Sequence, residues 1–403
     1  MPLPAAFRAL AHADYRRFFA AQIVAQIGSW MQSVAQSWLV LQLTPSPFKL
    51  GLIGTLQFGP ILLLSIAAGA LADRVPKRRL LVTTQSVQCG YSLALAALVA
   101  SGHAQYWHVA VLACASGIVG ALDGPARQSF IADLVGARDV GSAVALNSAS
   151  FNAARIVGPA LGGLIIARWG VVPAFLANGL GLLISIVALA RMSTAGAPRG
   201  QRGDSVLAEI AEGLDYIRRS REILLALGLL TAVSFCVFNF SVYVPLIVRT
   251  VLHIGAEGFG FLMAALGVGA VAGALAVSVL GKPPRGLLVA AAGLACAGLF
   301  SLSFARHFWM AAPILTWTGF FGIILVAGAN TTLQLAAPDE LRGRVMSVYT
   351  LVWGGAFPIG AFMVGAIAER WGVGRALLIQ GLGGMVAVGA LFAWSRAGLS
   401  RRR

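Results

Sequence analysis

The sequence predicts an all-α membrane protein with twelve transmembrane helices arranged as two pseudo-symmetric bundles of six. Composition is the first reason, because 58% of the 403 residues are hydrophobic and only 11% are charged, whereas about 25% of a soluble domain is charged. The other two reasons are a series of apolar segments of membrane-spanning length and an internal duplication. A β-barrel would instead show segments of about ten residues with alternating hydrophobicity.

Apolar segments with few or no charges recur along the whole chain, and about 20 such residues cross a hydrocarbon layer of about 30 Å. They lie at 18–43, 50–72, 80–100, 107–126, 144–167, 172–190, 223–248, 259–280, 286–305, 309–335, 346–368 and 374–395. The first follows Arg16 and Arg17, is too long for the apolar core of a signal peptide and lacks a small-residue cleavage site. We therefore interpret it as a retained helix.

The formal net charge of +16 would suit a nucleic-acid-binding protein, but the distribution of the basic residues argues against that class. If the first segment begins in the cytoplasm, most basic residues lie on the cytoplasmic side, which is the positive-inside pattern. The opposite side holds only Lys49, Arg168, Arg249, Arg306, Arg370 and Arg375. We expect a multi-pass protein of the cell inner membrane, with both termini cytoplasmic and with membrane lipid as a partner.

The chain carries no motif of an enzyme or a metal site. Its four cysteines fall inside the apolar segments without a Cys-x-x-Cys pair, as buried small hydrophobic residues do, and its histidines lack metal-ligand spacing. It has neither a phosphate-binding loop nor a Gly-x-Ser-x-Gly elbow. We expect no enzymatic activity, no cofactor and no metal, and an ion gradient as the source of energy.

Two short sequences occur twice at nearly the same spacing. The run Ala68-Gly-Ala-Leu-Ala72 recurs at 272–276, an offset of 204 (272 − 68), and Arg168-Trp-Gly170 recurs at 370–372, an offset of 202 (370 − 168). Both offsets are half of the chain. Transporters are often built from such repeats, with the substrate site near the bilayer midplane where the halves meet. We expect an N-terminal bundle at 1–192 and a C-terminal bundle at 223–403.

A cytoplasmic linker is expected at 193–222, the longest polar stretch of the chain. Its first part, up to Gly203, is rich in Gly, Ala, Pro and Arg and reads as a flexible connection. Its second part predicts an amphipathic helix lying on the membrane surface, with Ser205 as N-cap. The apolar positions of that helix are Val206, Leu207, Ile210, Leu214 and Ile217. A tether between the bundles is the simplest role, and regulatory contacts are the alternative.

The loop from Gly69 to Arg79 packs five charges, four of them basic, between two apolar segments. Its order is Gly69-Ala-Leu-Ala-Asp73-Arg74-Val-Pro76-Lys77-Arg78-Arg79. The second copy has Val277 where the first has Asp73, and only Lys282 and Arg285 beyond it. A topological anchor needs only the basic residues. The retained acid therefore suggests a moving latch, a gating loop made of Gly69, Asp73, Arg74, Lys77 and Arg78.

Ionisable residues inside membrane segments are costly and mark functional sites. Arg155 lies eleven residues into the segment that starts near 144, which is about 16 Å deep at 1.5 Å per residue. It predicts a water-filled cavity, an acidic partner or an anionic substrate. The alternative is a structural arginine bonded to neighbouring carbonyls.

Asp123 lies about one turn from the expected end of its segment, where the helix dipole disfavours a carboxylate, so a compensating cation is required. Arg127 at i+4 is one candidate, and Arg155, Arg74 and Arg78 are others. One hypothesis is a protonatable carboxyl coupled to an arginine, as in a proton relay. The other is a static charge pair between two helices.

Polar residues line one face of the first segment at spacings of 4, 3, 4 and 3, which share a helix face. They are Gln22, Gln26, Ser29, Ser33 and Gln36. Cavity lining and interhelical hydrogen bonding both fit this stripe. Weaker candidates of the same kind are Asn147, Asn152, Asn239 and Asn330 with Gln334, and Trp30 and Trp38 could stack on a substrate.

The run Gly158-Pro159-Ala-Leu-Gly162-Gly163 combines a helix-bending proline with small residues that permit close helix approach. This run resembles the antiporter motif of the major facilitator superfamily, and the gating loop resembles the signature loop of the same superfamily, with Pro76 where the family usually has Gly. Three further stretches resemble the branch that contains the enterobactin exporter. They are Asp123-Gly-Pro-Ala-Arg127, Asn147-Ser-Ala-Ser150 and Ala154-Arg-Ile-Val-Gly158-Pro159.

The resemblance implies the major facilitator fold, alternating access and proton-driven export, with Asp73 and the basic cluster as a cytoplasmic gate latch. We therefore expect a monomeric secondary exporter that exchanges protons for a small amphipathic or anionic compound, a siderophore or a drug. One alternative is an importer of a nutrient or lysolipid with the same fold. Another is a non-transporting membrane sensor or assembly subunit, which would be expected to carry an appended soluble domain.

Overall fold

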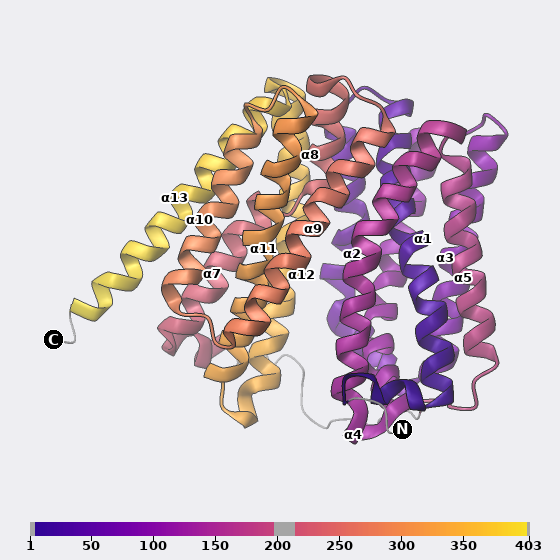
Figure 1. Cartoon of the computed structure of the whole chain (residues 1–403), viewed down its shortest axis with the longest axis horizontal. Coiled ribbons are helices and arrows are strands. Elements are labelled where there is room, and N and C mark those ends of the chain that lie inside the picture. Colours follow the sequence, from indigo (N-terminus) through magenta and orange to yellow (C-terminus); the bar gives the residue numbers. More distant parts are fainter. Residues whose placement is uncertain (1–4, 197–213, 401–403) are drawn as a thin grey trace. The chain divides into compact units, whose positions relative to one another are not determined.

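The computed structural model describes residues 5–196 and 214–400, and every regular element in these ranges is a helix (Figure 1). The first set is η1 (Ala5–Ala11), α1 (Ala13–Leu43), α2 (Pro47–Arg74), α3 (Lys77–Ala100), α4 (Tyr106–Trp169) and α5 (Val172–Ala190). The second set is α7 (Arg221–Cys236), α8 (Phe240–Ile247), η2 (Val248–Leu252), α9 (Ala256–Leu280), α10 (Arg285–Leu302), α11 (Phe308–Ala336), α12 (Asp339–Trp371) and α13 (Val373–Ser400). The predicted all-helical fold is confirmed.

Nine helical stretches of the described chain are long and apolar enough to cross a membrane. One of them, α4, contains two of the predicted segments. Helices α1 and α3 are not among the nine, because polar residues lower their mean hydropathy. With 31 and 24 residues they are nevertheless about 46 and 36 Å long at 1.5 Å per residue. The helices therefore account for the twelve predicted segments.

Helix α4 is two helices joined at Gly136, whose φ of 71° and ψ of 173° are non-helical. A residue without Cβ adopts this backbone conformation at no steric cost. The first half of α4 therefore continues to Val135, about three turns beyond Asp123. The expectation that Asp123 lies near a helix C-terminus is wrong, and the dipole is not the reason this carboxylate needs a partner.

The predicted segment 223–248 is interrupted at Val237–Asn239, between α7 and α8. The Asn239 amide Nδ2 donates to the carbonyl of Phe235 (2.8 Å), four residues earlier. That carbonyl would otherwise accept the backbone N–H of residue 239 in a continuous helix, so the side chain competes with the helical ladder. The remainder of the segment continues as α8 and the π-helical turn η2.

The described helices group into two compact units. Unit 1 comprises 1–45, 56–202 and 255–264, and unit 2 comprises 46–55, 203–254 and 265–403. In unit 1, α1 and α3 both pack on α4 and α5, around a core that includes Tyr15, Phe18, Leu81, Phe130 and Leu189. In unit 2, α7 packs on α11, α12 and α13, and α10 packs on α11 and α13.

The predicted amphipathic helix of the linker lies mostly outside the described residues, and only its last turn, 214–219, is described as helical. Ile217 is buried there in the core of unit 2, together with Ile223 and Leu333. The Tyr216 hydroxyl donates to the carbonyl of Ala336 at 3.0 Å. This end of the linker therefore packs on unit 2 through Tyr216 and Ile217, while Leu214 is exposed.

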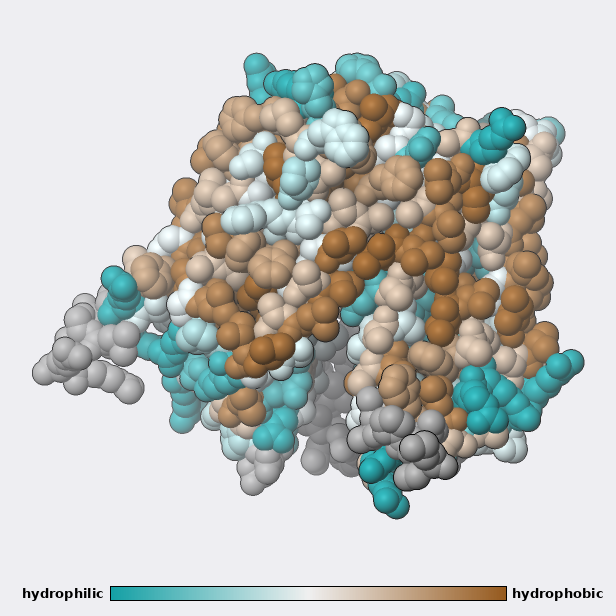
Figure 2. Space-filling view, viewed as in Figure 1, coloured by the Kyte–Doolittle hydropathy of each residue, from teal (hydrophilic) through white to brown (hydrophobic). Residues whose placement is uncertain are grey.

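The surface shows the pattern expected for contact with lipid. Large apolar side chains such as Leu63, Leu180, Val279 and Val386 are exposed, and Figure 2 shows hydrophobic residues over the middle of the helices with hydrophilic residues gathered near the helix ends. Contiguous exposed apolar surface of this extent is unfavourable in water. It is favourable in a bilayer, where the surrounding acyl chains are equally apolar.

Candidate functional site

Asp123 and Arg127 form an ion pair on the first half of α4, where i and i+4 residues share a face. The Arg127 Nε donates to Asp123 Oδ2 at 3.0 Å, and Arg127 Nη2 contacts the same oxygen. The other carboxylate oxygen accepts the hydroxyl of Thr84 on α3 at 2.8 Å. The Asp123 residue is only 8% exposed. Of the four cations proposed from the sequence, the structure pairs Asp123 with Arg127.

Arg127 extends this pair to α1, because its Nη1 donates to the side-chain oxygen of Gln22. Thr84, Asp123, Arg127 and Gln22 therefore form one network across α3, α4 and α1, all within unit 1. Each oxygen of the carboxylate has a donor. The bonds between this carboxylate and Arg127 are charge-assisted, and such bonds are stronger than neutral ones.

Arg155, on the second half of α4, lies apart from this network. Its guanidinium carbon is 5.9 Å from the centroid of the Trp30 ring on α1, within the distance of a cation–π contact. Trp30 in turn meets Phe151 edge to face, with ring centroids 5.8 Å apart. Arg155 forms no ion pair with any side chain that the structure describes. A half-buried cation beside two aromatic rings is suited to an anionic or electron-rich aromatic group.

The small residues of α4 explain how α1 reaches this position. A Cβ on Gly158 would lie 2.5 Å from the Trp30 Cβ and 2.9 Å from the Ile27 carbonyl oxygen. A Cβ on Gly162 would lie 3.2 Å from the Met31 Cα. Gly163 faces Gly260 of α9, where an added Cβ would lie 2.8 Å from the Gly260 Cα. Pro159 is buried between them. These residues place Trp30 directly beside the turn that carries Arg155.

Three residues of the polar stripe of α1 form hydrogen bonds to other residues, and the other two do not. Gln22 binds Arg127, Gln26 accepts the hydroxyl of Ser150 at 3.3 Å, and Gln36 donates to the Gln57 side chain of α2 at 3.0 Å. The Tyr91 hydroxyl of α3 also donates to Gln36. Ser29 is exposed and Ser33 is half-buried, and neither side chain bonds to another described residue. Interhelical hydrogen bonding therefore accounts for Gln22, Gln26 and Gln36, and cavity lining by Ser33 stays a prediction.

The side chains of the remaining polar candidates mostly form hydrogen bonds to residues four positions away in the sequence. Asn152 donates to the Ser148 carbonyl at 2.9 Å, and Asn330 accepts from Gln334 at 2.6 Å. Asn147 is half-buried, and its carbonyl accepts the Ser150 hydroxyl at 2.9 Å. The buried Oδ1 of Asn239 has no hydrogen-bond partner among the described residues. Asn239 thus interrupts the helix and also has an acceptor without a described partner. The candidate Trp38 stacks on Phe259, with ring centroids 6.3 Å apart.

A second polar cluster was not predicted from the sequence. The Gln32 side-chain oxygen accepts the Asn178 amide of α5 at 2.6 Å and also the Ser92 hydroxyl of α3. Ser92 contacts the Phe175 carbonyl oxygen as well, at 2.8 Å. Gln32 lies off the spacing of the stripe, Ser92 is one of several polar residues of α3, and Asn178 is an isolated amide in the apolar α5. Isolated amides of this kind were the available signal, because a buried amide requires a partner.

The gating loop has a well-defined anchor. Lys77 is fully buried, and its Nζ lies 3.6 Å from an Asp133 carboxylate oxygen on α4. The backbone N–H of Arg78 donates to the Ala195 carbonyl at 3.1 Å, and the Arg78 guanidinium donates to the Met192 carbonyl. Arg74 is exposed and Gly69 has open space around it. The Asp73 side chain lies outside the described part of the chain.

Asp14, just before the predicted first segment, binds the same stretch of chain after α5. One of its carboxylate oxygens accepts the N–H and hydroxyl groups of Ser193 and Thr194, at 2.8–3.0 Å. Desolvation by burial raises the pKa of Asp14, but these four hydrogen bonds outweigh it and hold the pKa below its usual value. Asp14 and Arg78 together fix residues 192–195 where the chain leaves unit 1.

The helical fold, the internal duplication and the polar networks within lipid-facing helices define a polytopic membrane transporter. A family model described as a transmembrane secretion effector, of the major facilitator type, matches residues 4–398. The chain belongs to this family of major facilitator transporters, and it is a transporter rather than an enzyme.

Curated relatives include siderophore and drug transporters. The Staphyloferrin A transporter of Staphylococcus aureus is 26% identical, with 91% of this chain and 92% of the relative aligned. The multidrug efflux pump Tap of Mycolicibacterium fortuitum is 28% identical over 90% and 91%. The enterobactin exporter EntS of Escherichia coli is 25% identical over 88% and 85%.

Solved structures share the fold at low identity. A bacterial homologue of the human lysosomal transporter Spinster, inward-facing and unoccupied, superposes with a TM-score of 0.75 at 12% identity, over 96% of this chain and 97% of that one. A peptide-transporter-family (POT) protein in complex with 5-aminolevulinic acid also gives 0.75 at 12% identity, over 95% and 96%. These likenesses support the predicted major facilitator fold.

Proposed function

We propose that this protein exports a small amphipathic or anionic compound, a siderophore or a drug, across the cell inner membrane in exchange for protons. Arg155 beside Trp30 and Phe151 is the observation that carries the proposal. A cation held inside a membrane protein without a carboxylate partner is costly unless it serves a ligand. The siderophore and drug transporters among the relatives support the same substrate class.

Asp123 is the proposed site of proton coupling. Its carboxylate is buried, satisfied on both oxygens and shared with an arginine that reaches α1. Binding of a proton would release Arg127 from Asp123 and loosen the link between α1, α3 and α4. The gating loop, from Gly69 to Arg78, is proposed as the cytoplasmic latch of alternating access. Both termini are placed in the cytoplasm, and the monomer is the transporting unit.

Transport into inverted vesicles tests the proposal. Inverted membrane vesicles from cells that make the protein would be supplied with a catecholate siderophore or an amphipathic drug, with and without an imposed pH gradient. Counterflow would be measured with purified protein in proteoliposomes. We expect gradient-dependent movement of one of these compounds, and counterflow without a gradient. Uptake in the opposite direction would indicate the importer alternative. The absence of counterflow with every tested compound, from protein that is folded and monodisperse, would contradict a transport function for these substrate classes.

A further inference from the structure

Unit 2 contains a cavity of about 560 Å³ that opens to the surface at one end of its helices. Three connections build it: the η2 turn at Thr250 and Val251, the α10–α11 loop at 303–306, and the α12–α13 turn at 371–375. All three lie at the end of unit 2 opposite the 281–284 turn, because α9 and α10 run between those ends. Under the proposed topology this end faces outward.

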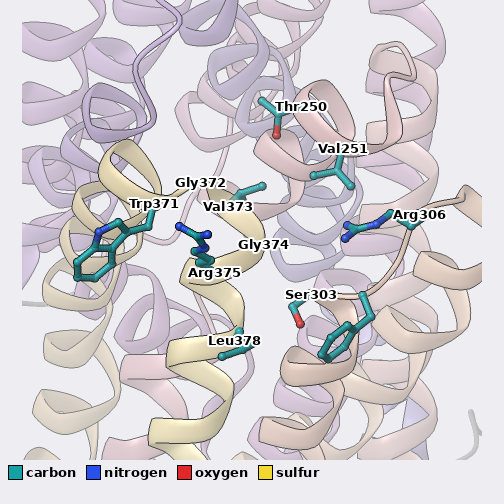
Figure 3. A pocket seen from close by; sticks show the side chains of 11 residues that line it. Thr250, Val251, Ser303, Arg306, Trp371, Gly372, Val373, Gly374, Arg375 and Leu378 are labelled. Atoms are coloured by element: carbon teal, nitrogen blue, oxygen red, sulfur yellow. The ribbon is translucent and has the colours of Figure 1, made fainter.

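Two arginines dominate the chemistry of the cavity. Figure 3 shows the Arg306 guanidinium directed from the α10–α11 loop into the space before α13, with Arg375 on the opposite wall. None of the lining residues that the structure describes is acidic. The hydroxyls of Thr250 and Ser303 already donate to carbonyls of their own helices, at 2.7 and 2.6 Å. Of the described lining side chains, the two arginines and the indole N–H of Trp371 are therefore the donors available to a ligand.

Neither arginine forms an ion pair with a carboxylate of the described chain, in contrast to two basic residues at the other end of unit 2. At the other end of the unit, Lys282 and Arg285 both pair with Glu222, at 3.4 and 3.3 Å. Both arginines are exposed, so solvent screens their mutual repulsion. An anion that reaches both guanidinium groups forms charge-assisted hydrogen bonds with them.

The internal duplication shows that these charges are specific to the second half. Under the 202-residue offset, Trp371 and Gly372 correspond to Trp169 and Gly170, but Arg375 corresponds to Pro173 (375 − 202). Under the 204-residue offset, His307 corresponds to His103, but Arg306 corresponds to Gly102 (306 − 204). The two halves therefore share Trp-Gly and His at these positions, whereas both arginines occur only in the second half. They also oppose the positive-inside tendency, which disfavours outward arginines.

Two aromatic side chains at the cavity indicate an amphiphilic ligand. Trp371 and Phe304 line it and are about half exposed, at 54% and 52%. Tryptophan is favoured at the headgroup level of a bilayer, so the cavity lies where a lipid headgroup and the first part of its acyl chain would meet the protein.

We propose that this cavity binds the phosphate or carboxylate head of an anionic amphiphile, with anionic phospholipid of the outer leaflet as the expected source. Arg306 and Arg375 bind the head from two sides, and Trp371 and Phe304 contact its apolar part. The proposal depends on the proposed topology only for the choice of leaflet, and it is independent of the exported compound.

Binding of fluorescent phosphatidylglycerol to the purified protein in neutral detergent tests this site. We expect about fivefold weaker binding for each of R306Q and R375Q, because one basic residue contributes about that factor near an anionic surface. Phosphatidylcholine should bind weakly to all variants. R168Q is the matched control, since Arg168 is an exposed arginine at the corresponding end of unit 1 and should leave binding unchanged.

Three outcomes decide the proposal. Loss of phosphatidylglycerol binding in R306Q/R375Q, with retention in R306K/R375K, supports an anion site and also excludes misfolding as the cause. Competition by millimolar inorganic phosphate supports the same chemistry with a water-soluble source. Equal phosphatidylglycerol binding by wild type and R306Q/R375Q, with unchanged melting temperature in phosphatidylcholine, overturns it.

Discussion

At the scale of single residues, Arg155 makes the clearest prediction. Its guanidinium contacts Trp30 at 5.9 Å and has no carboxylate partner among the described side chains, so its replacement should affect ligand more than folding. We expect R155Q to lower efflux of an anionic substrate about tenfold, since a hydrogen bond from a charged donor to the substrate would contribute about 1.5–3 kcal/mol. R155K keeps the charge but not the planar stacking surface. Its efflux rate should lie between those of wild type and R155Q. Accumulation of the substrate in cells measures the efflux, and the melting temperature of the purified protein measures the effect on folding.

A control for this prediction is N152A, whose side chain bonds only to its own helix, one turn away on α4. It should leave efflux unchanged. If R155Q exported an anionic substrate as fast as wild type, the assignment of Arg155 to the substrate site would be wrong.

Asp123 makes the second residue-scale prediction. D123N keeps the shape but removes the charge that balances Arg127, and losing a charged hydrogen bond in a buried site costs about 1.5–3 kcal/mol. We expect a lower melting temperature and efflux that no longer depends on the pH gradient. T84V removes the 2.8 Å hydrogen bond to the same carboxylate without changing charge, so it should destabilise while preserving the pH dependence. Undiminished proton-driven efflux by well-expressed D123N would exclude the proton role.

The sequence predicted residue-scale features unequally well. It placed Asp123 beside four candidate cations, and the helix geometry of i and i+4 selected Arg127. It could not place Trp30 over Arg155, because that contact depends on how closely α1 approaches Gly158. The cluster of Gln32, Ser92 and Asn178 was missed because its members come from three helices. Periodicity along one helix carries no information about which helix lies opposite.

At the scale of elements, the gating loop is held by an ion pair between a fully buried lysine and a half-buried aspartate. The Lys77 Nζ lies 3.6 Å from Asp133, and removing one partner of such a pair leaves an uncompensated charge, at a cost of up to about 3 kcal/mol. We expect K77M to destabilise strongly. The double variant K77M/D133N should recover part of the loss, with a coupling energy of at least about 1 kcal/mol. Denaturation of the four proteins of the cycle measures this.

The matched control is R79Q, because Arg79 belongs to the same basic cluster but is exposed, where a charge contributes little to stability. Additive effects of K77M and D133N would show that the pair is not an energetic unit, and the proposed latch would then need another anchor.

Helix positions were predictable from apolar length, whereas interruptions within helices were not. The limits of α5 agree with the predicted 172–190, since a run of apolar residues bounded by charged and glycine residues is enough to define them. The break at Val237–Asn239 arises because one amide captures the Phe235 carbonyl. The continuity of α4 to Val135 was equally hidden, because Arg127 and Asp133 interrupt the uncharged segment. Phe130 and Leu134 nevertheless continue the packing of the helix in the core of unit 1.

At the scale of the whole molecule, the duplication and the asymmetry of charge together predict the topology. Each basic residue moved to the outer side opposes the positive-inside preference, so the orientation with cytoplasmic termini is favoured. His103, in the α3–α4 loop, should then be outside, and Ala137, beside the Gly136 break, should be inside; both are exposed. In a protein whose four cysteines are replaced, H103C should react with an impermeant maleimide on intact spheroplasts, and A137C only after permeabilisation. Because the first half of α4 separates the two positions, one pattern excludes the other. Labelling of A137C on intact spheroplasts would reverse the orientation and place the cavity of Arg306 and Arg375 in the cytoplasmic leaflet.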